Sequence, residues 1–341
     1  MYLHGLGHFH PSNVIDNDFL GSLDIGLDPD WIASRVGIRE RRTVLPLDYI
    51  RKERNRCLQA ADEASLYSNA QTAARAAQMA LTRARLTVHD IGLVISSSSC
   101  PQWVSPAESC VAAAELGIER ALCFDVNAAC SSFAVQLWTL SLMDRRRLPD
   151  FILLLQPENL TRAVDYYDRN TAVLMGDAST AAIVSLTVES DIRLDFPIVQ
   201  CNSERWEHCV IPARGHFRHN GSAAQRFAIT KMTETLQALA ASVKPNSYFI
   251  GHQANLTMLR AVCERAGVPA DRHLYNVDRF GNCGCAGPVS VLSEHWDRLG
   301  HDDIRIAAVG AGLTWAGMAV HFNRNIQPDY REENEHACAR M

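Results

Sequence analysis

The chain has 341 residues, of which 47% are hydrophobic and 21% charged, and its formal net charge is -5 at pH 7. This composition is typical of a folded protein and excludes disordered, collagen-like and coiled-coil chains, while the mild acidity argues against nucleic acid as a ligand because phosphate-binding surfaces carry excess basic residues. Because the sequence shows neither an apolar run of the ~20 residues that span a bilayer nor the layout of a secretory signal, we expect a cytoplasmic protein that does not bind a membrane.

The first half of the chain alternates between helical and strand patterns. Apolar residues recur at helical spacing in the alanine-rich residues 70–85, whereas residues 91–99 form an apolar run that ends in serines. The predicted elements of this half are, in chain order, a helix over 70–85, a strand over 91–99, a helix over 106–116, a strand over 121–126, a buried helix over 131–143 and strands over 151–156 and 180–186. Short apolar strands separated by helices indicate a mainly parallel sheet that is covered on both faces.

The second half repeats this style. Its predicted elements are a helix over 225–241, a strand over 247–250, a helix over 256–266, a strand over 274–277, a helix over 288–299 and strands over 304–309 and 314–322. We therefore predict two α/β halves that meet at a seam near residues 186–222. The predicted organisation is an N-terminal half over 1–186, a C-terminal half over 187–325 and a loose polar tail over 326–341.

The eleven cysteines are odd in number and irregularly spaced. A disulfide framework belongs to small secreted domains, so we expect most of these thiols to be reduced and buried. Cys283 and Cys285 are the only close pair, and no second pair follows at the spacing of a zinc site. We therefore predict neither a metal site nor a bound cofactor.

Reactive side chains stand at three predicted strand–helix junctions. Cys130 follows a strand and a turn of small residues and precedes a hydrophobic helix, where unpaired N–H groups and the helix dipole favour a thiolate and can receive an oxyanion. His252 lies between a strand and a helix, and Asn282 lies in a glycine-rich turn. Each residue alone is more often structural, but together they form a nucleophile with donors for a developing anion.

These junctions and four other motifs resemble the β-ketoacyl-(acyl carrier protein) synthase III family of thiolase-like condensing enzymes. The resemblance extends from residue 1 to about residue 323. The motifs that carry it are Trp31 with Arg35, Gly37 and Arg41; Cys130; Asp168 with Arg169 and Thr171; Leu174 with Gly176 and Asp177; His252 with Asn255; Arg279 with Gly281 and Asn282; and Gly310 with Gly312 and Trp315.

The resemblance implies a five-layered αβαβα sandwich of two duplicated halves that assembles as a homodimer. It implies that Cys130, His252 and Asn282 are catalytic, and that main-chain amides of Cys130 and of the turn holding Ala311 and Gly312 form the oxyanion hole. The residues that it implies for binding of coenzyme A or another thioester are Trp31, Arg35, Arg169 and Asn255. Coenzyme A and phosphopantetheine thioesters, the latter on an acyl carrier protein, would be substrates.

The implied reaction loads an acyl group onto Cys130 and condenses it with a malonyl-type or β-ketoacyl thioester, in fatty-acid-like or polyketide biosynthesis. His252 and Asn282 would stabilise the enolate that decarboxylation produces. Two alternatives stay open: acyl transfer from Cys130 to an alcohol or amine with His252 as general base, and a non-catalytic partner subunit. The sequence argues against the non-catalytic alternative, because the chain retains all three catalytic residue types.

The sequence departs from the family pattern in three places. The turn after Asn282 holds cysteines and glycines where the family usually has hydroxyl residues. Thr257 and Glu264 replace basic residues of the usual carrier-protein docking patch, which leaves Arg260 and Arg265 and weakens attraction to an acidic partner. Residues 200–222 form a short histidine-rich stretch that is either a solvated loop or part of the tunnel mouth. The resemblance also places Glu108 in a helix that lines the pocket of the partner subunit in this family, which makes it a candidate extra base.

Overall fold

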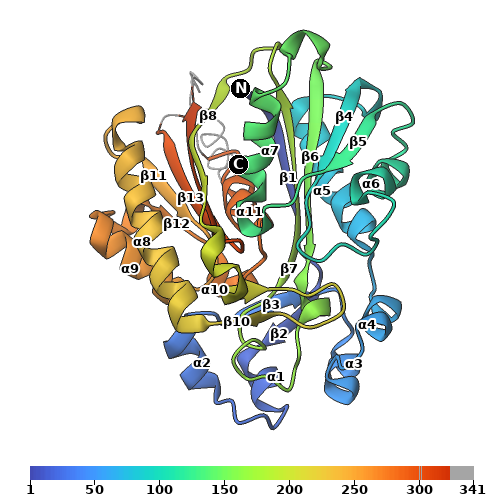
Figure 1. Ribbon diagram of the computed structural model, residues 1–341, viewed down its shortest axis with the longest axis vertical. Helices are drawn as coiled ribbons and strands as arrows, with labels where there is room; N and C mark the ends of the chain where they lie inside the picture. The colour runs from blue at the N-terminus through green and yellow to red at the C-terminus, as the bar shows by residue number, and fades with distance from the viewer. Residues whose placement is uncertain (299, 301, 323–341) are drawn as a thin grey trace, which may run out of the picture.

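The computed structural model describes residues 1–298, 300 and 302–322, so the predicted polar tail lies outside the described residues. Ten strands form one sheet (Figure 1), in the order β12-β11-β13-β14-β8-β1-β7-β6-β4-β5. Their bounds in chain order are β1 Tyr2–Phe9, β4 Ile91–Ser96, β5 Leu122–Asp125, β6 Phe151–Asn159, β7 Asp177–Ser185, β8 Ile192–Cys201, β11 Tyr248–Gly251, β12 His273–Leu274, β13 Ile304–Gly310 and β14 Thr314–Phe322.

The same strand-pairing pattern occurs twice. In the first half, β4 pairs parallel with β5 and β6, while β7 runs antiparallel to β6 and β1. In the second half, β11 pairs parallel with β12 and β13, while β14 runs antiparallel to β13 and β8. Strands β1 and β8 join the two halves, with Tyr2 opposite Arg193. The sheet therefore shows the internal duplication directly, whereas the domain boundary at residues 186 and 187, which falls between β7 and β8, stays a prediction.

The expectation of a mainly parallel sheet is wrong, because five of the nine strand pairings in the large sheet are antiparallel. Helical crossovers connect the parallel strands β4, β5 and β6. By contrast, residues 160–176 join β6 to β7 without an α-helix, and only residues 311–313 join β13 to β14. A connection without a crossover helix brings the second strand back antiparallel to the first.

Helices form three layers around the two halves of the sheet (Figure 1). Helices α5 (Asn69–Ala84) and α6 (Glu108–Leu116) cover the outer face of the first half, and α8 (Gly221–Leu239) and α9 (Leu256–Ala266) cover that of the second. Helices α7 (Ser132–Ser141) and α11 (Ala286–Glu294) lie between the halves, where α7 contacts β6 and β8 while α11 contacts β1 and β11. This arrangement is the five-layered αβαβα sandwich.

The first 64 residues contain elements that sequence reasoning did not predict. They are β1, β2 (Asn13–Asp16), α1 (Asn17–Gly21), α2 (Pro29–Val36), β3 (Glu40–Thr43), α3 (Leu47–Glu53) and α4 (Leu58–Ala64). Strand β1 is central although it contains Gly5 and Gly7. A Cβ at Gly7 would lie only 1.9 Å from the main-chain oxygen of Ala76 in α5, so the glycines allow the helix to pack directly on the strand.

Several boundaries differ from the prediction in the second half. Strand β8 falls in the predicted seam, and the predicted strand over 274–277 is the two-residue β12 followed by helix α10 (Val277–Phe280). The remaining short elements are β9 (Cys209–Val210), β10 (Arg218–His219) and the 3₁₀ turns η1 Val88–Asp90, η2 Ala129–Ser131, η3 Arg145–Arg147, η4 Leu160–Ala163, η5 Ser203–His208, η6 Ala240–Ser242 and η7 Ala270–Arg272.

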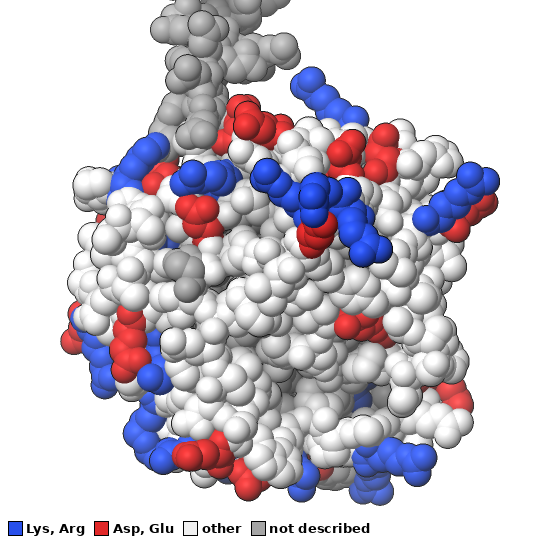
Figure 2. Space-filling model, turned by 45° about the horizontal axis from the view of Figure 1, so that its top comes forward, with Lys and Arg blue, Asp and Glu red and all other residues white. Residues whose placement is uncertain are grey.

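Charged side chains are unevenly spread over the face seen in Figure 2. Lys and Arg gather along its upper part, with Asp and Glu among them, and charged side chains also lie along its lower-left and bottom edges, whereas the middle of this face carries few charges. Among the described residues, no helix is both long and apolar enough to cross a membrane.

Candidate active site

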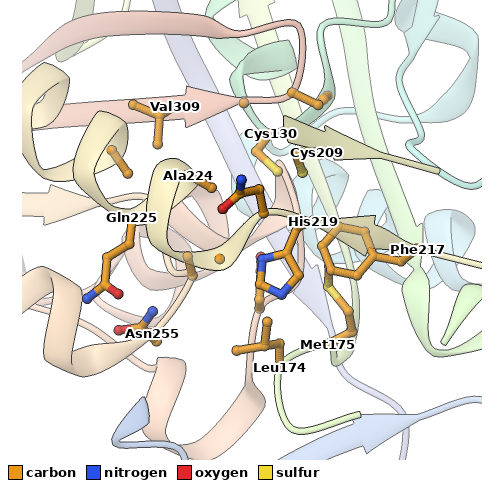
Figure 3. A pocket seen from close by; sticks show the side chains of 18 of the residues that line it. Cys130, Leu174, Met175, Cys209, Phe217, His219, Ala224, Gln225, Asn255 and Val309 are labelled. Atoms are coloured by element: carbon orange, nitrogen blue, oxygen red, sulfur yellow. The ribbon is translucent and has the colours of Figure 1, made fainter. Parts of the chain in front are cut away.

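One cavity of about 1120 Å³ gathers the predicted catalytic triad, the predicted oxyanion-hole residues and the predicted thioester-binding residues. These residues come from separate segments of both halves, and part of the cavity wall is shown in Figure 3. The predicted residues that line it are Trp31, Arg35, Cys130, Arg169, His252, Asn255, Asn282, Ala311 and Gly312. Their roles stay predictions, but their convergence on one space is a property of the fold.

Cys130 lies in the 3₁₀ turn η2, two residues before α7 begins at Ser132. The preceding Ala129 has a φ of +47°, a left-handed conformation that is unfavourable for a residue with a Cβ. Burial, with smaller contributions from the neighbouring Cys209 and Glu158, raises the pKa of the Cys130 thiol well above its ordinary value. Burial therefore opposes the thiolate that we expected the helix N-terminus to favour, because desolvation penalises the charged form.

This pKa direction predicts how Cys130 reacts with iodoacetamide. Because the thiolate is the nucleophile, alkylation should be slow near pH 7 and should keep rising to at least about pH 9, without a plateau below it. Quantitative peptide mass spectrometry across this pH range would measure the rate, with the exposed Cys57 as an accessible reference thiol. A rate that is already constant below about pH 7 would instead show a stabilised thiolate and contradict the prediction.

The turn between β13 and β14 packs directly against the amide of Cys130. A Cβ at Gly310 would lie 3.0 Å from the Cys130 nitrogen, so glycine is needed for this close approach. The Thr314 hydroxyl donates to the Ala128 carbonyl at 3.3 Å and to Ser131 Oγ at 3.1 Å, which ties β14 to the nucleophile turn. The amide of Cys130 and the turn that begins at Gly310 are therefore in close contact, as the predicted oxyanion hole requires.

His252 follows β11 directly and is held by its main-chain N–H, which donates to the Ala307 carbonyl at 2.9 Å. Its side chain is buried, and its Nδ1 has no hydrogen-bond partner among the described residues. Burial lowers the pKa of His252 to about 4, so the imidazole is neutral at pH 7. A neutral imidazole keeps one N–H donor and one acceptor nitrogen, which suits a residue that donates a hydrogen bond to a thioester carbonyl.

Asn282 is fixed on both its main chain and its side chain. Its main-chain N–H donates to the Leu174 carbonyl at 2.8 Å, and its carbonyl accepts from the Gly176 N–H at 3.0 Å. The side-chain Oδ1 accepts the N–H of Gly284 at 3.0 Å. Because this oxygen is occupied, the amide NH₂ is the group that Asn282 can direct at a ligand in the cavity.

The same cavity is also lined by the predicted nucleotide-binding residues. Trp31 and Arg35 lie on α2, whose first turn is capped by Asp28 through the Trp31 N–H at 2.8 Å. The guanidinium Cζ of Arg169 lies 5.3 Å from the centroid of the Trp31 ring. Asn255 caps α9 by accepting the Met258 N–H at 2.7 Å, which leaves its NH₂ as a donor. An aromatic face with two arginines is suited to a nucleotide with phosphates.

The histidine-rich stretch contributes a wall of the cavity that sequence reasoning left open. Trp206, Cys209 and His219 line the cavity, and the His219 ring lies 5.2 Å from that of Phe217 (Figure 3). His208 is not among the lining residues. This stretch holds more aromatic and histidine side chains than an ordinary solvated loop. That composition was the signal in the sequence that favoured the tunnel-mouth alternative.

Two other candidates occupy different environments. Glu108 is buried, accepts hydrogen bonds from the Asn69 side chain and the Gln102 N–H, and does not line the cavity of its own chain. Cys283 and Cys285 are buried near Asn282. Within the described part of the chain, no three His, Cys, Asp or Glu side chains are grouped so that they could hold a metal ion.

The duplicated five-layered sandwich, in which a cysteine from one half lines the same cavity as a histidine and an asparagine from the other, defines a protein of the thiolase fold with a cysteine-centred site. Family models of 3-oxoacyl-[acyl-carrier-protein] synthase III and of its C-terminal part match residues 124–198 and 236–322. The β-ketoacyl-[acyl-carrier-protein] synthase III of Clostridium botulinum strain Okra is 30% identical over 339 residues, covering 93% of this chain and 97% of the relative.

Solved structures agree with this result. The 3-oxoacyl-[acyl-carrier-protein] synthase III of Aquifex aeolicus is 27% identical with a TM-score of 0.82, covering 94% of this chain and 99% of that one. The enzyme of the same name from Pseudomonas aeruginosa is 26% identical with a TM-score of 0.80, covering 95% and 98%. The chain belongs to the 3-oxoacyl-(acyl carrier protein) synthase III family.

Proposed function

We propose that this protein is an acyltransferase that loads an acyl group onto Cys130 and condenses it with a malonyl-type thioester. The observation that carries the proposal is the convergence of Cys130, His252 and Asn282 on one cavity, with the nucleophile amide packed against the turn at Gly310. The relatives named as synthases of this type support the same reaction class.

In the first half-reaction, the Cys130 sulfur attacks the thioester carbonyl and coenzyme A leaves. The proton lost by the thiol is gained by the departing thiolate, so the exchange is proton-neutral overall. His252 lines the same cavity as Cys130, and its neutral imidazole is the group that can take up this proton and return it to the leaving thiolate. The Cys130 amide and one amide of the Gly310 turn hold the tetrahedral oxyanion.

In the second half-reaction, the carbonyl of the malonyl thioester accepts hydrogen bonds from His252 and Asn282. Loss of carbon dioxide then leaves an enolate whose negative charge these two donors stabilise. The enolate carbon attacks the acyl carbonyl, a carbon–carbon bond forms, and the Cys130 thiolate leaves and is protonated. Both donors are buried, so their hydrogen bonds to the enolate are not weakened by water.

We propose coenzyme A and carrier-protein thioesters as substrates, with Trp31, Arg35 and Arg169 binding the nucleotide and Asn255 the thioester arm. On α9, the exposed Arg260 and Arg265 stand beside the exposed Glu264 and Thr257. This mixed surface supports weaker attraction of an acidic carrier protein than a continuous basic patch would give.

We also propose a homodimer. Strand β5 forms one edge of the ten-stranded sheet and exposes Leu122, and the loop before α6 exposes Trp103 and Val104. An unpaired edge strand beside exposed apolar side chains is typical of a surface that pairs with another chain.

Intact-mass and product analysis tests the proposed function. We expect incubation with acetyl-, butyryl- or octanoyl-coenzyme A to add one acyl mass per chain, and subsequent malonyl-coenzyme A to remove it with release of a β-ketoacyl thioester and carbon dioxide. Discharge only to an added alcohol or amine would support acyl transfer instead. Absence of any adduct with every thioester would support the non-catalytic alternative.

A further inference from the structure

We propose that Glu158 is a positioning residue for the condensation step: it fixes the turn that orients Asn282, without touching the substrate itself. The proposal rests on the proposed function. It concerns a buried carboxyl on β6 that has no part in the reaction scheme above and that the sequence analysis did not single out.

Glu158 is fully buried and accepts four hydrogen bonds from two separate segments. One carboxyl oxygen, Oε2, accepts the Ser99 N–H at 2.9 Å. The other oxygen, Oε1, accepts the Ser99 hydroxyl at 2.9 Å, the Cys285 N–H at 3.2 Å and the Cys285 thiol at 3.0 Å. All these donors are uncharged, so the carboxyl is placed by directional hydrogen bonds and not by an ion pair.

The turn that Glu158 holds is also the turn that holds the Asn282 side chain. Gly284 donates its N–H to Asn282 Oδ1 at 3.0 Å, and the next residue, Cys285, donates both its N–H and its thiol to Glu158. A Cβ at Gly284 would lie 2.5 Å from Glu158 Oε1, so main chain and carboxyl are in direct contact. A shift of the carboxyl must therefore move the group that keeps the Asn282 amide in one orientation.

The carboxyl also lies beside the reacting end of the cavity. Ser99, which donates both its N–H and its hydroxyl to Glu158, lines the cavity together with Cys130 and Asn282. Glu158 therefore bonds two segments that border the site, whereas the equally buried Glu108 bonds Asn69 and Gln102 outside it.

The substitution Glu158→Gln tests this role with little change of shape. A glutamine amide has one acceptor oxygen, and the N–H groups of Ser99 and Cys285 bond to different oxygens of Glu158. Whichever way the amide is turned, either the Ser99 N–H or the Cys285 N–H faces an NH₂ group, so the side chain no longer bridges the two segments through both N–H groups.

We expect Glu158→Gln to slow condensation by about 10- to 100-fold, because small misplacement of a donor has large effects on rate. The rate at which Cys130 is loaded, measured by intact mass, should stay within about twofold of that of the wild type, since Asn282 acts only in the second step. Asp303→Asn is the matched control, because Asp303 is also a buried carboxyl but is hydrogen-bonded to the Lys244 N–H and to His321 and does not line the cavity; it should leave both half-reactions within about twofold. Glu158→Asp, which restores two acceptor oxygens, should recover part of the condensation rate.

A double mutant separates positioning from general stability. In the Asn282→Ala background, Glu158→Gln should change condensation by less than about twofold, because the group it positions is gone. Equal slowing of loading and condensation, or an undiminished effect in that background, would overturn the proposal. If Glu158→Gln does not fold, Cys285→Ala, which removes only the thiol donor, must show the same selective slowing of condensation or the proposal fails. A wild-type protein that loads but never condenses would instead refute the proposed function.

Discussion

Cys130→Ala is expected to abolish covalent acyl labelling completely. The acyl group can be retained only by a nucleophile, and alanine removes the sulfur while leaving the amide that packs against the turn at Gly310. Intact mass after incubation with acyl-coenzyme A should show no adduct on the variant and one adduct on the wild type.

The matched control for this experiment is Cys209→Ala. Cys209 lines the same cavity, its side chain lies next to that of Cys130 in Figure 3, and burial raises its pKa to about 11. Cys209 lies in the two-residue strand β9 and not in the turn whose amide packs against Gly310, so we expect Cys209→Ala to retain the adduct. An adduct that survives Cys130→Ala and disappears with Cys209→Ala would assign the nucleophile to Cys209.

His252→Ala is expected to reduce the rate of condensation by about 10² to 10³. This magnitude is typical for removal of one donor from a developing oxyanion in a buried site. Single-turnover measurement of β-ketoacyl product from preloaded enzyme would isolate this step from loading. Product formation within about threefold of wild type would show that His252 does not stabilise the enolate.

His273→Ala controls for the burial of His252. His273 is also buried, its pKa is also lowered to about 4 by burial, and its Nε2 has no partner among the described residues. It does not line the cavity. We expect its replacement to lower the melting temperature through lost packing while the condensation rate of the folded fraction stays near that of wild type.

Local sequence patterns predict much of the fold. Helix α9 has the predicted bounds, and α5 begins one residue before its prediction because Ser68 and Gln71 form a capping box. These helices are amphipathic and end at recognisable caps. Strand β1 was missed because its glycines and histidines are poor strand formers, yet contact with α5 compensates for them. Helix α2 was missed because its sequence is short and mixed, although Asp28 and Gly37 cap both its ends.

Periodicity, caps and motifs along the chain were enough to predict the order of most helices and strands and the organisation in two halves. Motifs also predicted which residue types form the site. The burial that raises the pKa of Cys130 and lowers that of His252 follows from the tertiary structure, since it comes from segments that are distant in the sequence. The structure also decided that Glu158 is bonded to the Asn282 turn, because β6 and residues 283–285 are more than a hundred residues apart in the chain. Such long-range contacts leave no local pattern in the sequence.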